Sequence, residues 1–496
     1  MLLFSANPAW SDVAAIFRSV EAEAARLAAA PYQQPAATSV PTELLRLGYD
    51  QYRSVRYRAA GNLWRGESRS FEVQPLPAGF IFSPPVKIFV VNDDVERPLV
   101  AARDAFDWSD ARLAEQLPAE IPVAGFRLLF PLHRPDQLDE VAVFVGATYF
   151  RFLGREQSYG LSARAIAIDT GLPRREEFPH FRAIWLVEPQ RSASEMDVMA
   201  VVDSPALAGA YRFTIRPGTD TTVDVEAQLF LRHGVSLLGI APLTSMFLRG
   251  ERRERSHQDF RPEVHDADGL LVATQEGEWL WRPLDNPQSL AISAFALNAP
   301  RGFGLVQRDR DFASYQDLEA NYHLRPSYWV QPVGSWGEGE LRLIEIPSPA
   351  EIHDNIVAAW VPRRAAVAGD RLTFRYRVVA LKDASWLSPA GRAVSTRLGT
   401  TQLPGTGAPA PNQRRLVVDF AGGELAVLRP EQPVTAAVDI RGGRVIATRV
   451  EPVPALAGWR LTLDVESEAA RPAELRATLR LRDQVLTETW TYGLRP

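Results

Sequence analysis

Apolar residues near the start of the chain recur every three or four positions, which is the spacing of an α-helix. This pattern covers residues 13–27, and Ser11 or Asp12 can cap the first turn. Shorter helices are predicted to begin at Thr42 and at Ser109. We expect these helices to be peripheral elements of a protein built mainly of strands.

From about Arg53 onward, apolar and polar residues mostly alternate, as they do in half-buried strands. Residues 211–215 and 223–229 alternate on either side of a Pro-Gly-Thr-Asp turn, which predicts a hairpin. Residues 372–378 repeat the pattern. The 38 prolines fit many turns and edge strands. Short strands separated by frequent turns predict an all-β sandwich or barrel.

The stretch LGTTQLPGTGAPAPNQ interrupts this alternation because it is rich in glycine, proline and threonine. We predict a linker over residues 398–414, between an N-terminal domain (1–397) and a C-terminal domain (415–496). Alternation returns after the linker in several short strands. About eighty residues of such strands are typical of a small immunoglobulin-like sandwich.

Residues 308–340 follow neither pattern, since they are polar and aromatic with weak periodicity. A long irregular segment of this kind within a sheet domain favours a binding loop or lid. The alternative is a surface loop that has no binding role and packs around its own aromatic cluster.

Composition narrows the classes of protein that fit. A chain of 496 residues predicts two to three domains, and 46% hydrophobic residues indicate a globular protein. The net charge of −5 argues against a dedicated nucleic-acid binder. The absence of cysteine excludes disulfides and thiolate sites. No apolar run approaches the length of a membrane helix, and no signal peptide is expected at this start.

The segment HQDFRPEVHDADGLLVATQEGEWLWRPLDNP contains the largest group of chemically reactive side chains, with seven carboxylates, two histidines and two tryptophans. Acids among aromatic rings suit a site that cleaves carbohydrate, because carboxyl groups transfer protons and indoles stack on sugar rings. Motifs of P-loop, dinucleotide, zinc-protease and serine-hydrolase sites are missing from the sequence. We therefore assign no cofactor and no metal.

The acidic and aromatic side chains of this segment also have alternative roles. His265 beside Asp266 and Asp268 could hold a metal, but Asp268 also suits a turn that accepts backbone N–H groups. Trp281 shares a strand face with a second tryptophan, which fits either the core or a sugar platform. Glu278 could form a cross-face ion pair with the arginine at 282.

A second acidic cluster spans residues 345–356. Within it, Asp354 precedes an apolar run, beside a histidine and an asparagine, and a turn cap explains that position equally well. Asp266 and Asp354 are 88 positions apart. Sequence spacing alone therefore does not bring them together.

Several longer stretches resemble one protein family. They are FRPEVHDADGLL, GEWLWRPLDNP, GFGLVQRDRDF, RPSYWVQP, YGLSARAIAIDTG, APLTSMF and ELRLIEIPSPAEIHDNIVAAW, and they resemble segments of the osmoregulated periplasmic glucan biosynthesis proteins G and D. The resemblance runs from about Pro31 to Tyr492. It implies a large N-terminal sandwich similar to galactose-mutarotase-like domains, a smaller immunoglobulin-like domain, a periplasmic location and action on β-1,2-linked glucan.

The resemblance also implies site residues, position by position. The catalytic acids of the glucanase members fall on Asp266 and Asp354, and their tyrosine and arginine of the substrate-binding loop fall on Tyr322 and Arg325. This sequence departs at Ala267, where the family usually has serine. That change affects the expected efficiency rather than the chemistry.

As the resemblance implies it, the mechanism is inverting hydrolysis, with Asp354 as general acid and Asp266 as general base. The acid needs a pKa raised by burial or by a neighbouring carboxylate such as Glu351. Trp281 and Trp329 are candidate stacking platforms, with a core role open for both.

Three functions follow as expectations. The first is an endo-β-1,2-glucanase, with Glu351 and Glu278 also on the substrate side. The second is a transglycosylase that cyclises the glucan, and the third is a non-catalytic protein that binds glucan for the synthesis machinery. A homodimer is also expected from the resemblance.

Overall fold

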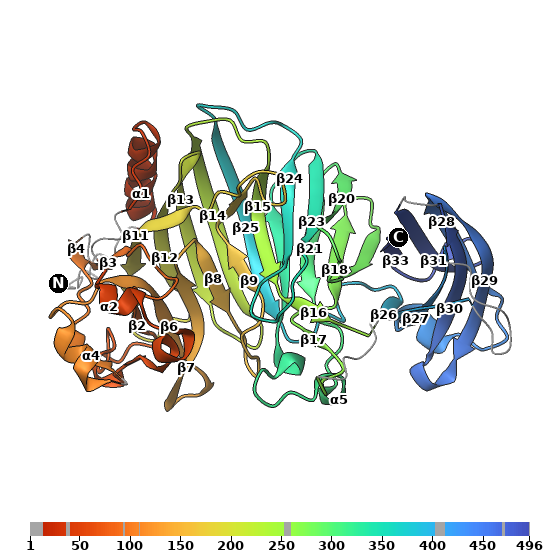
Figure 1. Ribbon diagram of the computed structural model, residues 1–496, viewed down its shortest axis with the longest axis horizontal. Coiled ribbons are helices and arrows are strands. Elements are labelled where there is room, and N and C mark those ends of the chain that lie inside the picture. Colours follow the sequence, from red (N-terminus) through yellow and green to blue (C-terminus); the bar gives the residue numbers. More distant parts are fainter. Residues whose placement is uncertain are drawn as a thin grey trace, which may run out of the picture. The chain divides into compact units, whose positions relative to one another are not determined.

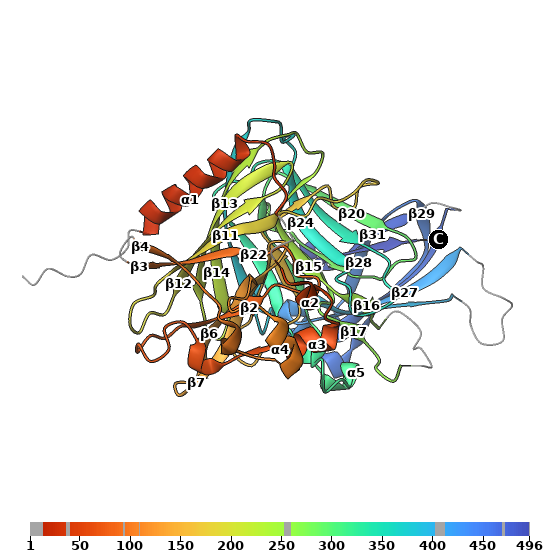
Figure 2. The ribbon, with the colours of Figure 1, turned by 60° about the vertical axis from the view of Figure 1, so that its left-hand side comes forward.

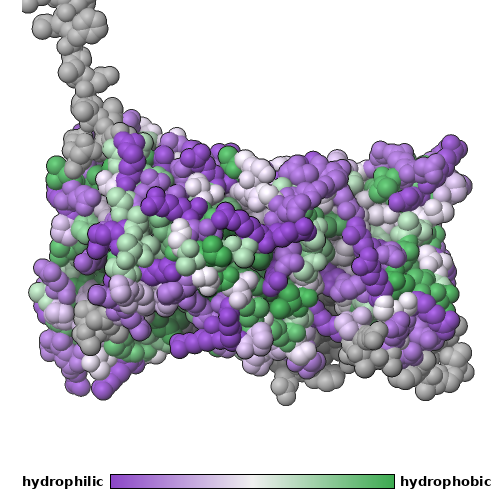
Figure 3. Space-filling model, turned by 90° about the horizontal axis from the view of Figure 1, so that it is seen from above, coloured by the Kyte–Doolittle hydropathy of each residue, from purple (hydrophilic) through white to green (hydrophobic). Residues whose placement is uncertain are grey.

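The computed structural model describes residues 13–35, 40–92, 95–108, 110–251, 259–401, 412–468 and 472–495. Strands make up 51% of the described residues and helices 12%, so the predicted all-β class is confirmed. None of the helices in these ranges is long and apolar enough to cross a membrane. On the face drawn in Figure 3, small hydrophobic areas lie between hydrophilic side chains.

The chain folds as two units. Unit 1 comprises Met1–Leu243, Val330–Glu340 and Ala359–Leu381, and unit 2 comprises Thr244–Trp329, Leu341–Ala358 and Lys382–Pro496. The domain boundaries expected from the sequence stay a prediction, and residues 402–411 of the predicted linker lie outside the described ranges.

Unit 1 is built on strands of two sheets. One sheet has the order β2 (Glu72–Pro77), β6 (Val123–Arg134), β7 (Gln137–Val145), β8 (Tyr149–Phe152), β9 (Ser162–Arg164) and β15 (Leu238–Ser245), with β10 (Ile166–Ile168) also pairing with β15. The other has the order β25 (Arg371–Leu381), β14 (Thr221–Leu231), β13 (Leu207–Arg216), β12 (Met196–Asp203), β11 (His180–Val187), β3 (Lys87–Asn92) and β4 (Val95–Pro98). The predicted hairpin is confirmed as β13–β14.

Helices of unit 1 begin close to where the sequence predicts them. They are α1 (Val13–Ala28), α2 (Thr42–Leu45), α3 (Tyr49–Ser54) and α4 (Ala111–Gln116). The predicted caps at Ser11 and Asp12, and the predicted start at Ser109, lie outside the described residues. Figure 2 shows α1 along β13, and its apolar face, including Phe17 and Val20, packs on Met199 and Ala210.

Unit 2 carries the acidic segments. One run of paired strands has the order β28 (Val434–Arg441), β31 (Ala473–Leu481), β33 (Thr489–Leu494), β19 (Trp279–Pro283), β18 (Gly269–Thr274), β21 (Pro300–Val306) and β22 (Ser327–Val333). A four-stranded sheet has the order β26 (Arg392–Gly399), β27 (Gln413–Ala421), β30 (Gly458–Ser467) and β29 (Gly443–Val453). Further elements are β16 (Phe247–Arg249), β17 (Val264–His265), β20 (Ala291–Leu297), β23 (Gly339–Glu345), β24 (Ile356–Pro362) and α5 (Phe312–Tyr315). Figure 1 shows β16, β17 and α5 close together at the lower edge of this unit.

The segment 308–340 is more ordered than its composition predicts. Its second half contains β22, so the expectation of a continuous irregular segment is wrong there. In its first half, Tyr315 and Tyr322 are buried against Met246 and Val264. These rings tie the segment to the core of unit 2.

Two indole rings of unit 2 lie over glycines. A Cβ at Gly269 would come within 2.3 Å of the ring of Trp281, and one at Gly302 within 2.4 Å of the ring of Trp329. Each tryptophan is only 3% exposed. The glycines are therefore needed for close packing rather than for backbone conformation.

Replacing Gly269 with alanine should lower the free energy of unfolding by about 1–3 kcal/mol, because the new methyl group overpacks the core beneath Trp281. Gly399→Ala is a matched control, since nothing lies within 4 Å of a Cβ at that strand position. Urea unfolding of both variants makes the comparison. Equal stability of the two variants would contradict close packing of Trp281 on this glycine.

Candidate functional site

Asp266 is held in place by reciprocal bonds with one residue. Its backbone N–H donates to the carbonyl of Met246 at 2.9 Å, and the N–H of Met246 donates to its Oδ2 at 3.3 Å. The residue is 2% exposed. The pairing of β16 with β17 brings these two residues together, because it aligns Phe247 with His265.

Arg325 supplies the counter-charge of Asp266. Its Nη1 donates to Asp266 Oδ1 in a close ion pair. The carbonyl of Ala320 accepts from its Nε and Nη2, both at 3.3 Å, and its guanidinium lies 4.1 Å from the ring centroid of Tyr322. These contacts fix the plane of the guanidinium, so the carboxylate of Asp266 is oriented as well as neutralised.

Asp354 lies in a different electrostatic environment. Thr244 Oγ1 donates to its Oδ2 at 3.3 Å. Burial raises the pKa of Asp354 to about 6. Of the two causes that the sequence left open for this shift, the structure favours burial over the charge of Glu351.

Asn355 fixes the backbone beside this acid. Its Oδ1 accepts from the N–H of Phe247 at 2.8 Å, and its Nδ2 donates to the carbonyls of Phe247 and Ile346, both at 3.0 Å. An amide side chain that bridges two backbone segments holds them at a defined spacing. Asp354 is therefore attached to the strand ends by its neighbour as well as by Thr244.

Both acids are thus bound by one short segment, Thr244–Phe247, which we call the acid-binding segment. It runs from the end of β15 into β16. Thr244 binds Asp354 and Met246 binds Asp266. Residues two apart in an extended chain have Cα atoms about 7 Å apart, so neighbouring points of one segment bind the two acids.

Tyr322 and Glu351 also belong to this neighbourhood. The hydroxyl of Tyr322 donates to Glu351 Oε2 at 2.7 Å. Burial, and then this hydrogen bond, raise the pKa of Tyr322. Of the residues predicted from the sequence, the structure therefore connects Asp266, Arg325, Tyr322 and Glu351 in one chain of contacts.

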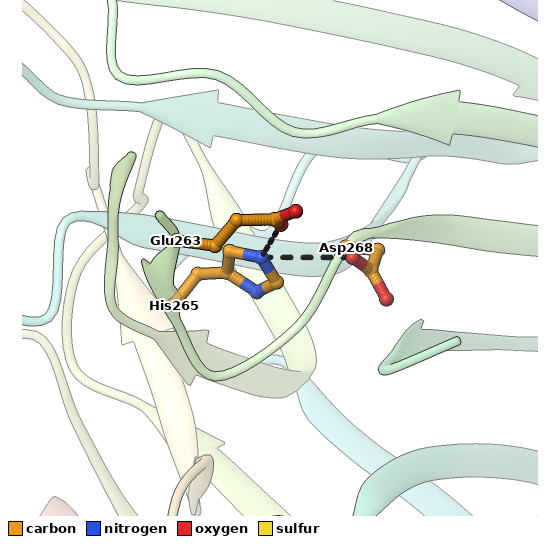
Figure 4. A group of neighbouring side chains, drawn as sticks. All are labelled: Glu263, His265 and Asp268. Atoms are coloured by element: carbon orange, nitrogen blue, oxygen red, sulfur yellow. Dashed lines mark hydrogen bonds and ion pairs between the residues drawn. The ribbon is translucent and has the colours of Figure 1, made fainter. Parts of the chain in front are cut away.

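A second group of charges flanks Asp266. Figure 4 shows the imidazole of His265 facing Glu263 and Asp268, with Nε2 at 2.8 Å and 3.6 Å from their oxygens. Their ligand atoms lie within 4.8 Å of one another, close enough to surround a cation. However, a metal-bound imidazole usually donates its other N–H to an acceptor, and His265 Nδ1 has no hydrogen-bond partner among the described residues. The contacts favour a histidine that donates from Nε2 to Glu263.

Asp268 accepts backbone N–H groups, as the sequence predicts. The donors are Arg308 and Asp309, the latter at 2.8 Å, and they follow the end of β21. Asp268 therefore accepts backbone N–H groups, but from a distant segment rather than from the local Asp-Gly turn that the sequence suggested. Asp268 thereby connects two parts of the chain that lie about forty positions apart.

Of the remaining predicted residues, Trp281 and Trp329 lie on β19 and β22, and Glu278 directly precedes β19. The guanidinium of Arg308 lies 3.5 Å from the ring centroid of Trp281, and Trp329 stacks on Trp279 at 5.8 Å. With both rings buried, the structure favours the core role that the sequence left open. Glu278 accepts a hydrogen bond from Thr489 on β33 at 2.6 Å.

The sequence offered an ion pair between Glu278 and Arg282 as one alternative, but each of these residues pairs with another residue. Arg476 donates to Glu278 at 2.6 Å, and Arg282 donates to Glu474 at 2.7 Å. Both partners are on β31, which the sequence does not place beside these residues.

Sequence reasoning missed Thr244, Met246, Asn355 and Arg261. The first two lie in the stretch APLTSMF, which carries part of the family resemblance but no acid. Asn355 follows Asp354 directly, and its two bonds to Phe247 could not be read from spacing.

Comparison with known proteins supports the resemblance. A family model described as "Periplasmic glucan biosynthesis protein, MdoG" matches residues 16–494. The "Glucans biosynthesis protein G" of Ralstonia nicotianae is 44% identical over 485 residues, which cover 96% of this chain and 95% of that protein. The protein of the same name from Rhodopseudomonas palustris is 43% identical over 473 residues, covering 95% and 92%.

A further relative comes from Pseudomonas paraeruginosa. Its "Glucans biosynthesis protein G" is 40% identical over 504 residues, which cover 99% of this chain and 94% of that protein. Matches of this length include the acid-binding segment and both acids. The chain therefore belongs to the MdoG family of periplasmic glucan biosynthesis proteins.

Proposed function

We propose that this protein is a periplasmic, inverting endo-β-1,2-glucanase. Its family places it in periplasmic glucan metabolism. One observation carries the finer proposal. Two carboxyl groups are anchored on the acid-binding segment, one with a pKa raised to about 6 and the other paired with a guanidinium. Pairs of acids in such opposite environments divide into a proton donor and a proton acceptor.

Asp354 is the proton donor in this scheme. A carboxyl group with a pKa near 6 still carries a proton in mildly acidic to neutral solution. It protonates the glycosidic oxygen as the bond to the anomeric carbon breaks, and the leaving sugar departs with a free hydroxyl.

Asp266 is the proton acceptor. Arg325 occupies Oδ1 and the N–H of Met246 contacts Oδ2, which leaves other lone pairs of the carboxylate for a water or a sugar hydroxyl. Water that loses its proton to Asp266 attacks the anomeric carbon from the opposite side. An inverting mechanism requires the two carboxyl groups to be about 6.5–9.5 Å apart, so that this water fits between Asp266 and the sugar.

A cyclising transglycosylase is the second candidate. The observation that favours it is the burial of Asp266, which is 2% exposed and so has little access to bulk water. If a hydroxyl of the same glucan chain replaces water as the nucleophile, the same two acids produce a ring. A homodimer and an association with the glucan synthesis machinery stay predictions.

Asp354→Asn and Asp266→Asn should each lower cleavage of linear β-1,2-glucan by at least about 10³-fold, because each removes one of the two proton transfers. Glu338→Gln, an exposed acid paired with Arg363, is the matched control. Chromatography with mass analysis distinguishes the outcomes. Shorter linear chains indicate a hydrolase, products lighter by one water indicate cyclisation, and binding without turnover would leave a scaffold as the function.

The pH profile should show the protonation of Asp354. Since the acid must carry its proton, kcat/KM should fall as the pH rises through about 6. Initial rates from about pH 4.5 to about pH 8.5 test this. A rate that increases over the interval from about pH 6 to about pH 8 is incompatible with Asp354 as the acid.

The free energy of unfolding should also depend on pH because of the raised pKa of Asp354. The folded state keeps the proton of Asp354 up to about pH 6, whereas the unfolded chain loses it near the ordinary value of 3.8, so folding is disfavoured as the pH rises. The stability of Asp354→Asn relative to the wild type should therefore increase by about 1–2 kcal/mol from about pH 4.5 to about pH 8. Urea unfolding at both pH values measures it. A difference that does not depend on pH would exclude the raised pKa.

A further inference from the structure

Arg261 bridges acidic side chains from three parts of unit 2. Its Nε and Nη2 form a two-point pair with Asp259, both at 3.0 Å. Its Nη1 donates to Asp317 and to Glu351, both at 2.8 Å. The side chain of Arg261 is 16% exposed, so these bonds are partly shielded from water.

One of these contacts reaches the side of the site that contains Asp266. Asp317 uses its other oxygen, Oδ1, to accept the N–H groups of Glu319 and Ala320 at 2.9 Å and 2.7 Å. Ala320 in turn accepts from the guanidinium of Arg325, the partner of Asp266. The orientation of that guanidinium therefore depends on a turn whose capping acid is held by Arg261.

The other contact reaches the side that contains Asp354. Glu351 lies three residues before Asp354, and its Oε2 accepts from both Arg261 and the hydroxyl of Tyr322. The ring of Tyr322 lies under the guanidinium of Arg325. Arg261 thus closes a circuit of contacts that runs through Asp317, Ala320, Arg325, Tyr322 and Glu351 and touches Asp266 through Arg325.

Charge balance explains why an arginine is needed at this position. Three carboxylates converge on one guanidinium, and Arg249 pairs with one of them, Asp259, at 2.9 Å. Burial raises the pKa of Asp317, but the N–H of Ala320 and then Arg261 outweigh burial, and the net shift is downward. Without Arg261, Asp317 and Glu351 would face each other without the cation that they share, and like charges would push the two loops apart.

We propose that Arg261 is a positioning residue, which sets the spacing between the Arg325–Asp266 pair and the loop that carries Asp354. This role rests on the proposed glucanase function of the two acids. Arg261 touches neither acid, so it acts through Asp317 and Glu351. A displacement of about 1 Å between catalytic groups costs about 10²-fold in rate, which makes such spacing important.

Arg261→Met in the full chain should lower kcat on linear β-1,2-glucan by about 10²-fold and change KM by less than about threefold, because the hydrogen bonds that it removes join the two loops rather than hold the sugar. Arg261→Lys should recover part of kcat, since one ammonium group reaches fewer of the three carboxylates. Arg363→Met removes an exposed ion pair and is the matched control. A kcat within about twofold of the wild type for Arg261→Met would overturn the proposal.

Asp317→Asn is a second test in case Arg261→Met does not fold. The asparagine keeps an oxygen that accepts from Glu319 and Ala320 and loses only the charge that faces Arg261. It should lower kcat in the same direction, and the double variant with Arg261→Met should be no worse than Arg261→Met alone. Additive losses would mean that the two residues act independently, contrary to the proposal.

Hydrogen–deuterium exchange separates this inference from the glucanase proposal, because it requires no turnover. In Arg261→Met, residues 315–325 and 346–354 should both exchange faster, and in Arg363→Met neither should. Inactivity of the wild type on glucan would refute the proposed function alone. Unchanged exchange in both loops of Arg261→Met would refute the positioning role.

Discussion

The acid-binding segment imposes the constraint on which the rest of the site depends. Four consecutive residues, Thr244–Phe247, bind one acid through a side chain, the other through a backbone N–H, and Asn355 through both backbone groups of Phe247. Any shift of this segment would move both carboxyl groups together. The two acids can therefore differ in environment while their anchors stay at a fixed spacing.

The opposite environments of the acids have separate physical origins. Asp354 accepts a hydrogen bond from a threonine hydroxyl, and burial disfavours its charge. Asp266 is also buried but faces a guanidinium that is itself fixed by Ala320 and by the ring of Tyr322. A buried ion pair such as Asp266–Arg325 is tolerated only when its remaining polar atoms are hydrogen-bonded. The turn capped by Asp317 meets this need, because it places the carbonyl of Ala320 against the guanidinium of Arg325.

The fold was predictable where its determinants are local. Periodicity predicted the helix at 13–27 and the hairpin of β13 and β14, because a helix face or a pair of neighbouring strands needs only nearby residues. It failed for pairings between distant residues. Glu278 and Arg282 have partners on β31 almost two hundred positions away, and the order in residues 308–340 depends on burial of Tyr315 and Tyr322.

The site was predictable only through family resemblance. That resemblance indicated Asp266, Asp354, Tyr322 and Arg325. Of the tryptophans considered as sugar platforms, Trp281 and Trp329 prove to be buried over glycines. The sequence did not indicate Thr244, Met246 and Arg261, because a single hydroxyl, a backbone donor and a bridging charge leave no pattern in residue spacing. Their roles depend on which loops the sheets bring together.

The anomeric form of the first product tests the inverting mechanism most directly. Proton NMR during the early turnover of linear β-1,2-glucan reports whether the new reducing end is α or β before it equilibrates. Direct attack of water activated by Asp266, opposite a bond protonated by Asp354, predicts the α-anomer. A β-anomer, which requires a covalent intermediate and closely spaced carboxyl groups, would contradict this mechanism, as would the absence of any new reducing end.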